Sequence, residues 1–146
     1  MVGLRRDVLL DTGPLVAVLD RDDPWHDACI ERMAACLARC LTSEAVVCEA
    51  CHLVGRGGGR GELPLEALLA AGIPILGLEA PGHRQAAALM ARYRNLPMDY
   101  ADASLVVLAD ALDIATVFTL DRRGFSAYRR LKGSALVLVP LPKRPK

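Results

Sequence analysis

Carboxylates are the side chains of this 146-residue sequence that are best placed to do chemistry together. Asp11 closes the apolar run VLL and Asp121 closes the run VFTL, so each stands at the end of an expected strand. Glu49 interrupts an otherwise apolar helical stretch, where an unpaired carboxylate would be costly. Asp102 opens another helix, three residues after Asp99, and the positive end of a helix favours negative charge.

These acids predict a site for a hard divalent cation if the fold brings them together. About four negative charges in one pocket would repel one another and raise their pKa values unless a cation neutralised them. Oxygen ligands without His or Cys favour Mg²⁺ or Mn²⁺ over Zn²⁺. Such an ion can activate water and stabilise the charge that grows on a phosphodiester, so hydrolysis of a nucleic-acid backbone is the leading chemistry.

Short apolar strands separated by amphipathic helices are expected to position the acids. The strands do not alternate in polarity, which favours a parallel sheet covered by helices on both faces. In such a sheet, ligands bind at the carboxyl ends of the strands, where Asp11 and Asp121 are expected. We expect strands at 8–10, 40–42, 74–78, 116–120 and 135–139, helices after the first strand and at 24–39, 43–54, 64–71, 81–94 and 100–112, and a glycine-rich loop at 55–61.

The composition indicates one well-buried domain. A hydrophobic content of 53% in a chain of this length predicts a single core over residues 1–140, followed by a flexible basic tail at 141–146. The net charge of +1 excludes a generally cationic nucleic-acid coat protein, so contacts with nucleic acid should be local. The chain has no apolar run of membrane-spanning length, residues 1–11 lack the long apolar stretch and small-residue cleavage site typical of a signal peptide, and the five cysteines are an odd number. We therefore expect a cytoplasmic protein that binds no membrane and has free thiols.

Four segments of the chain, in order, resemble the PIN-domain family: VLLDTGPL (8–15), TSEAVVCEA (42–50), PMDYADASL (97–105) and FTLDRRGF (118–125). The resemblance implies a three-layer α/β/α fold with a central, mainly parallel sheet. It also implies that Asp11, Glu49, Asp102 and Asp121 are catalytic and hold one or two Mg²⁺ or Mn²⁺ ions. Within the family the chain looks most like the VapC toxins of toxin–antitoxin pairs. That likeness implies a Mg²⁺-dependent endoribonuclease that acts on RNA, forms a homodimer and has a cognate antitoxin.

Some residues near these acids allow more than one interpretation. Asp99 is a secondary candidate for metal binding, although its position is more typical of a helix cap. Glu44 competes with Glu49, which we prefer because it lies further inside the helix, in register with the family's acid. Many relatives have Ser where this chain has Gly13, so Thr12 is left to contact phosphate. Beside Asp121, Arg122 and Arg123 are expected to bind substrate phosphates, with Arg129 and Arg130 nearby.

Other chemistries fit the sequence less well. The segment CEACH (48–52) has the spacing of a haem attachment site, but it lies in an expected core helix, and the cysteine spacing lacks the paired ligands of a zinc site. Arg56 and Arg60 either reach substrate phosphates or belong to an ordinary surface loop. Two alternatives to the nuclease stay open. One is a catalytically inactive PIN-like module that binds RNA or protein. The other is a phosphate-accepting receiver-like domain, which predicts a Lys where this chain has Asp121.

Overall fold

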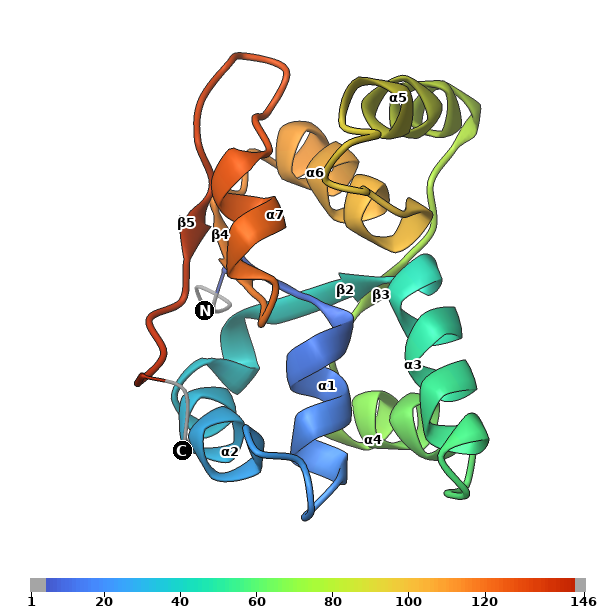
Figure 1. Ribbon diagram of the computed structural model, residues 1–146, viewed down its shortest axis with the longest axis vertical. Coiled ribbons are helices and arrows are strands. Elements are labelled where there is room, and N and C mark those ends of the chain that lie inside the picture. Colours follow the sequence, from blue (N-terminus) through green and yellow to red (C-terminus); the bar gives the residue numbers. More distant parts are fainter. Residues whose placement is uncertain (1–4, 144–146) are drawn as a thin grey trace.

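A parallel sheet forms the centre of the molecule, and the computed structural model describes it within residues 5–143 (Figure 1). The strand order is β3-β2-β1-β4-β5, and every neighbouring pair is parallel. The order reverses between β1 and β4, which makes the carboxyl ends of these two strands the expected place for a ligand. The strands are β1 (Val8–Leu10), β2 (Cys40–Ser43), β3 (Ile75–Leu76), β4 (Thr116–Phe118) and β5 (Val137–Leu138).

Helices cover both faces of the sheet, so the expected three-layer α/β/α fold is confirmed. Helices α1 to α4 lie on one side, and α5, α6 and α7 lie on the other (Figure 1). A short 3₁₀ turn, Leu37–Arg39, leads into β2. None of these helices is long and apolar enough to cross a membrane. Their bounds are α1 (Thr12–Leu19), α2 (His26–Cys36), α3 (Glu44–Arg56), α4 (Leu63–Ala71), α5 (Ala80–Arg92), α6 (Tyr100–Leu112) and α7 (Arg122–Ala127).

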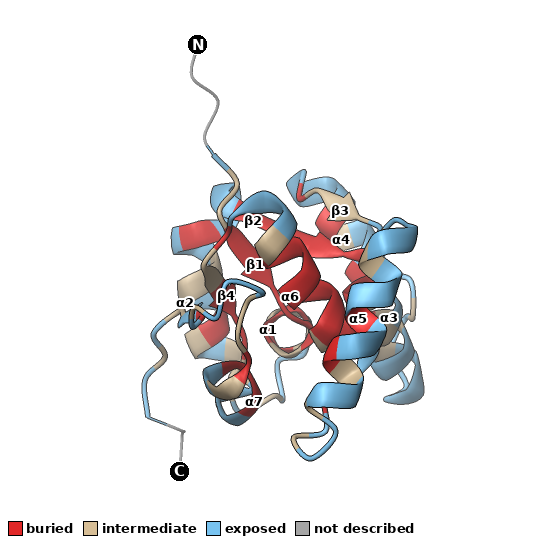
Figure 2. Ribbon diagram, turned by 90° about the horizontal axis from the view of Figure 1, so that it is seen from above, coloured by how far each residue is buried: buried red, intermediate tan, exposed pale blue. Residues whose placement is uncertain are grey.

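Helix α6 is the centre of the core, since every residue from 103 to 109 is buried (Figure 2). A helix that is apolar on all sides must be surrounded by other elements, and α6 packs against α5, α3 and β2. Its one buried hydroxyl, Ser104, donates to the Ala101 carbonyl at 2.6 Å and lies 2.7 Å from the hydroxyl of Ser43 at the end of β2. This contact ties the start of α6 to the carboxyl edge of the sheet.

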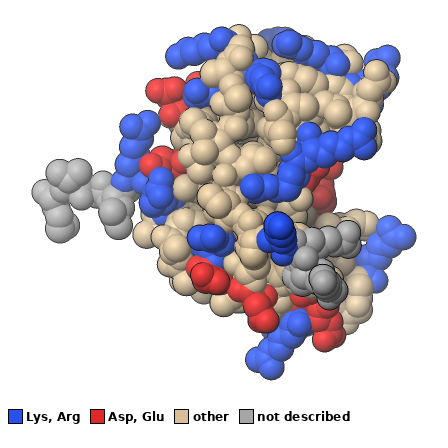
Figure 3. Space-filling view, turned by 60° about the vertical axis from the view of Figure 1, so that its left-hand side comes forward, with Lys and Arg blue, Asp and Glu red and all other residues tan. Residues whose placement is uncertain are grey.

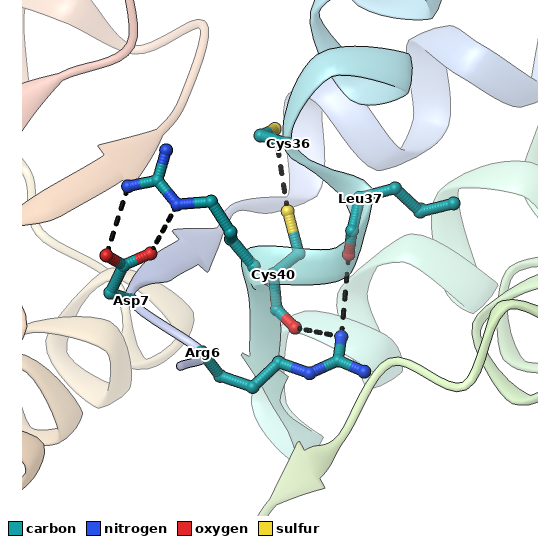
Figure 4. A network of polar contacts seen from close by, with 6 residues as sticks. Arg6, Asp7, Cys36, Leu37 and Cys40 are labelled. Atoms are coloured by element: carbon teal, nitrogen blue, oxygen red, sulfur yellow. Dashed lines mark hydrogen bonds and ion pairs between the residues drawn. The ribbon is translucent and has the colours of Figure 1, made fainter. Parts of the chain in front are cut away.

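A polar network holds the opposite, amino edge (Figure 4). The Arg39 guanidinium pairs with Asp7, with Nε 2.7 Å from Oδ1, and Arg6 donates to the Cys40 carbonyl at 3.0 Å. The thiols of Cys36 and Cys40 lie 3.7 Å apart without forming a disulfide, and all five cysteines are free, as expected. These contacts fix the starts of β1 and β2, so both strands deliver their last residues to the same edge.

Several expected boundaries are wrong in detail. The strands expected at 74–78, 116–120 and 135–139 shrink to β3, β4 and β5, because only some of their residues pair with a neighbouring strand. The loop expected at 55–61 starts only at Gly57, since α3 continues through Arg56. The polar stretch after Asp121 contains a helix, α7, that we did not expect. The expected tail reaches into residues 144–146, which lie outside the described residues, and its boundary at 140 stays a prediction.

Candidate active site

Asp11 lies at the centre of the candidate site, where β1 and β4 end side by side. Its N–H donates to the Phe118 carbonyl at 2.9 Å, and its carboxylate is only 6% exposed. The buried Thr119 hydroxyl donates to Asp11 Oδ2 at 2.7 Å and accepts the Asp121 N–H at 2.9 Å. Burial first, and then the charges of Asp99 and Asp121, raise the pKa of Asp11 to about 6, although the hydrogen bonds with Thr119 and the Thr12 backbone lower it. Asp11 is thus a buried carboxylate whose charged form is disfavoured, and Thr119 orients one of its oxygens.

Asp99 and Asp102 form a capping box at the start of α6. Asp99 Oδ1 accepts the Asp102 N–H at 2.8 Å, and Asp102 Oδ2 accepts the Asp99 N–H at 3.1 Å. Burial first, and then the charges of Asp99 and Asp11, raise the pKa of Asp102 to about 8. Asp102 therefore faces Asp11 while it caps its own helix. Asp99 is the N-cap of α6, which is the role that we considered more typical of its position.

Glu49 comes from α3, a helix that begins at Ser43. The Ser43 hydroxyl accepts the Val46 N–H at 3.1 Å, so the end of β2 leads directly into α3. Glu49 is half-buried on this helix, and its pKa rises to about 7 because of burial, then Asp99, then Asp11. Glu44 is exposed, and a Cβ on Gly77 would come within 2.8 Å of its carboxylate, so it lies beside the end of β3. The geometry favours Glu49 over Glu44 as the acid that faces the site.

Asp121 does not close β4 but stands three residues beyond it, as the N-cap of α7. Its Oδ1 accepts the Gly124 N–H at 3.0 Å, and its side chain is exposed. Its charge still contributes to the raised pKa of Asp11. A Cβ on Gly124 would collide with the Asp121 carboxylate, so glycine at this position lets the acid fold back over α7.

The expected phosphate-binding residues have different surroundings. The buried Thr12 hydroxyl has no hydrogen-bond partner among residues 5–143, although it lies close enough to Glu49 to lower the pKa of that acid. Arg123 is exposed, whereas Arg122 donates to the Val139 carbonyl at 2.8 Å. Arg130 pairs with Asp113 at the far end of α6, at 3.3 Å, so it is not beside Asp121 as expected. Figure 3 shows one face of the molecule, on which Lys and Arg side chains are spread out with Asp and Glu side chains between them.

Two further residues have simple explanations. Arg60 pairs with Glu62 and Glu66 at 3.0 and 2.8 Å, which favours the interpretation of its segment as a surface loop. At Gly13, a Cβ would lie 3.1 Å from the Cβ of Leu120, which is closer than side-chain contacts normally are. The backbone at Gly13 therefore packs tightly against the segment after β4, and a serine there would need Leu120 to move.

The fold gathers the predicted acids into one group, which we call the acidic cluster: Asp11, Glu49, Asp99, Asp102 and Asp121. Within residues 5–143, no three His, Cys, Asp or Glu side chains lie close enough to hold an ion as they stand. Mg²⁺ commonly binds through one or two carboxylates and keeps several waters, so a looser group still suits it. The all-oxygen donor set and the unpartnered Thr12 hydroxyl fit a hard cation.

The sequence did not single out three residues of the site. Thr119 orients Asp11, and Ser104 ties α6 to Ser43. The ring of Tyr128 is fully buried beside the cluster. Thr119 had a signal, because a hydroxyl at the end of an otherwise apolar run needs a partner when buried. Ser104 and Tyr128 had none, since their partners come from distant segments.

Comparison with known proteins identifies the family. The PIN domain family model matches residues 8–131. The chain is 35% identical to Ribonuclease VapC26 of Mycobacterium tuberculosis over 135 residues, which cover 91% of this chain and all of that protein. The crystal structure of M. tuberculosis VapC20, described as a sarcin-ricin loop cleaving toxin, superposes with a TM-score of 0.66 at 19% identity, covering 75% of this chain and 86% of that one. VapBC2 from Rickettsia felis, bound to a DNA fragment from its promoter, gives 0.64 at 16% identity and covers 92% of this chain and 98% of its own.

These two solved structures are less than 25% identical to the chain and show the fold alone. The family model and the 35% identical relative show similarity of sequence as well. A receiver-like domain is therefore set aside. The segments with which the sequence resembles the family all lie inside the matched range, residues 8–131. The chain belongs to the PIN domain family.

Proposed function

We propose that this protein is a metal-dependent endoribonuclease and the toxin of a toxin–antitoxin pair. One observation carries the proposal: Asp11, Glu49 and Asp102 come from three different elements, yet each has a raised pKa because it is buried and faces other acids. Such a group is unfavourable in itself, which makes a function its best explanation. A 35% identical relative, aligned over its whole length, is a ribonuclease by name.

Asp11 and Asp102 would hold the ion, with help from Glu49 and Asp121. When bound, Mg²⁺ or Mn²⁺ would supply a Lewis acid that activates water and stabilises the charge at phosphorus. Thr119 occupies only Oδ2 of Asp11, and the Asp99 N–H occupies only Oδ2 of Asp102. Each of these two carboxylates has a second oxygen that can face the ion, and the Thr12 backbone also interacts with the Asp11 carboxylate and lowers its pKa.

RNA is the proposed substrate, since VapC26 is named a ribonuclease and VapC20 a toxin that cleaves the sarcin-ricin loop. Arg123, exposed on α7 next to Asp121, is the cation best placed for a substrate phosphate. Arg122 contributes only if it leaves the Val139 carbonyl. The buried Thr12 hydroxyl is free to donate to an oxygen that enters the cluster.

An antitoxin and a second copy of the chain are the proposed partners. The support is the likeness to VapBC2, a toxin–antitoxin complex. An antitoxin arginine would fit the acidic cluster, because a guanidinium forks onto paired carboxylates. The homodimer and the cytoplasmic location stay predictions.

Cleavage assays with purified wild type, Asp11→Asn and Asp22→Asn test the proposal. Asp22 is an exposed acid of the turn after α1 and serves as the control. We expect RNA cleavage by wild type and Asp22→Asn with Mg²⁺ or Mn²⁺, and none with EDTA. Asp11→Asn should lose more than the roughly 10–100-fold that follows loss of an outer-shell partner. Equal cleavage by all three proteins, or none by any, would favour the inactive binding module instead.

A further inference from the structure

Tyr128 is a fully buried aromatic residue directly after α7. Its ring packs against the rings of Tyr93 and Phe125, with 5.1 Å between centroids in each pair. Tyr93 is tied to the same segment, because its hydroxyl accepts the Arg129 N–H at 3.1 Å. The phenol of Tyr128 therefore has a fixed position beside the acidic cluster.

The Tyr128 hydroxyl has no hydrogen-bond partner in the part of the chain that the structure describes. A buried polar group left unpaired destabilises the folded protein, and Phe would fill the same space without that cost. Gly124 lies against this hydroxyl, since a Cβ there would come within 2.8 Å of its oxygen. The same Cβ would collide with the Asp121 carboxylate, so the hydroxyl and this acid approach the same point.

The groups around the hydroxyl are acids whose carboxylate oxygens can accept a hydrogen bond from it. A phenol is protonated at neutral pH and therefore acts as a donor. Asp102, Asp121 and Asp99 are the carboxylates close enough for their charges to act on it. Asp102 has an oxygen to receive this bond. Its Oδ2 accepts the Asp99 N–H, whereas no hydrogen bond to its Oδ1 is found among the described residues. A carboxylate oxygen has two lone pairs, so Oδ1 can accept from the phenol and still face an ion.

We propose that Tyr128 is a positioning residue of the acidic cluster, whose hydroxyl donates to the Asp102 carboxylate directly or through one water. This bond would hold the carboxylate turned toward Asp11. The inference rests on the proposed function, because it treats Asp102 as a metal ligand. Loss of a residue that orients a ligand typically weakens metal binding about 10–100-fold.

Removing one hydroxyl at a time tests the inference. Tyr128→Phe keeps the ring and loses the proposed donor, and Tyr93→Phe is the matched control, since the Tyr93 hydroxyl contacts the Arg129 backbone instead of an acid. Mn²⁺ binding is measured from the electron paramagnetic resonance signal of the free ion. RNA cleavage is followed at limiting and saturating Mn²⁺, and circular dichroism checks that each variant is folded.

We expect Tyr128→Phe to bind Mn²⁺ about 10-fold more weakly or worse, and to need correspondingly more Mn²⁺ for half-maximal cleavage. Its rate at saturating Mn²⁺ should stay near that of wild type, and Tyr93→Phe should bind Mn²⁺ like wild type. Unchanged Mn²⁺ affinity in Tyr128→Phe, or an equal loss in both variants, would overturn the positioning role and leave the nuclease proposal standing. A wild type that binds no Mn²⁺ would overturn both.

Discussion

Asp11→Asn should make the metal-free protein more stable at neutral pH while it removes activity. The pKa of Asp11 rises from its ordinary value of 3.8 to about 6 in the folded state, so the folded protein holds this proton more tightly than the unfolded chain does. The resulting loss of stability is absent below pH 3.8, grows as the pH rises, and is complete above about pH 6. At about 1.4 kcal/mol for each tenfold change in acidity, the full penalty is about 3 kcal/mol. Asparagine has a similar shape but does not ionise, so this loss of stability is absent in the variant.

Urea denaturation of wild type and Asp11→Asn at pH 4 and pH 7.5, in EDTA, measures this effect. Between these two pH values, wild type should lose about 2–3 kcal/mol relative to the variant, or about 6–10 °C in Tm for a chain of this size. Excess Mn²⁺ at pH 7.5 should stabilise wild type and not the variant, because an ion that binds only the folded state raises its stability. Asp22→Asn should follow wild type under all conditions. If the free energies of unfolding of wild type and Asp11→Asn change in parallel from pH 4 to pH 7.5, the pKa of Asp11 is not raised in the folded protein.

Three further substitutions probe the supports of the cluster. Thr119→Val removes the donor to Asp11 and the acceptor for the Asp121 N–H. It should lower the free energy of unfolding by about 1–3 kcal/mol in urea titrations and the Mn²⁺ affinity by about 10–100-fold in calorimetry. A variant with wild-type Mn²⁺ affinity would exclude an orienting role for Thr119. Ser43→Ala removes the cap of α3 and the contact with Ser104, and should lower the free energy of unfolding by about 1–2 kcal/mol, with Ser126→Ala as an exposed control; equal stability of both variants would contradict it. Gly124→Ala places a methyl group against the Asp121 carboxylate and the Tyr128 hydroxyl. It should reduce RNA cleavage at least about 10-fold at a temperature where the protein stays folded. Unchanged cleavage by the folded variant would place Asp121 outside the site.

The elements that the sequence predicted best are those with a strong local signal. Helix α6 has the predicted bounds, because Asp99 and Asp102 cap it and apolar residues fill it. Helix α7 escaped prediction because it is only six residues long and has Gly124 in its middle, which by itself disfavours a helix. The strand ends were overestimated for a related reason: apolar residues continue beyond the few that pair with a neighbouring strand.

The site was predictable in its residue types but not in its geometry. Asp11 could be placed at a strand end from the sequence alone, since the apolar run before it is short and well marked. The choice between Glu49 and Glu44 depended on a family resemblance, because nothing in the helix itself says which residue faces β1. The structure separates them through the direction in which α3 leaves β2. Tyr128 shows the limit most clearly, since the charge of Asp102, 26 residues earlier in the chain, acts on it only in the folded protein.

The structural and the functional interpretations of these acids support each other, because a carboxylate has two oxygens. Asp102 uses one oxygen in the capping box, Asp121 uses one as the N-cap of α7, and Asp11 uses one to accept from Thr119. Each of these bonds fixes the rotation of the side chain and leaves the second oxygen available. The ordinary devices that begin helices at the carboxyl edge of the sheet therefore also orient the acids toward one another. Their mutual repulsion is a local cost that the large buried core around α6 can offset, which allows the cluster to persist before any cation binds.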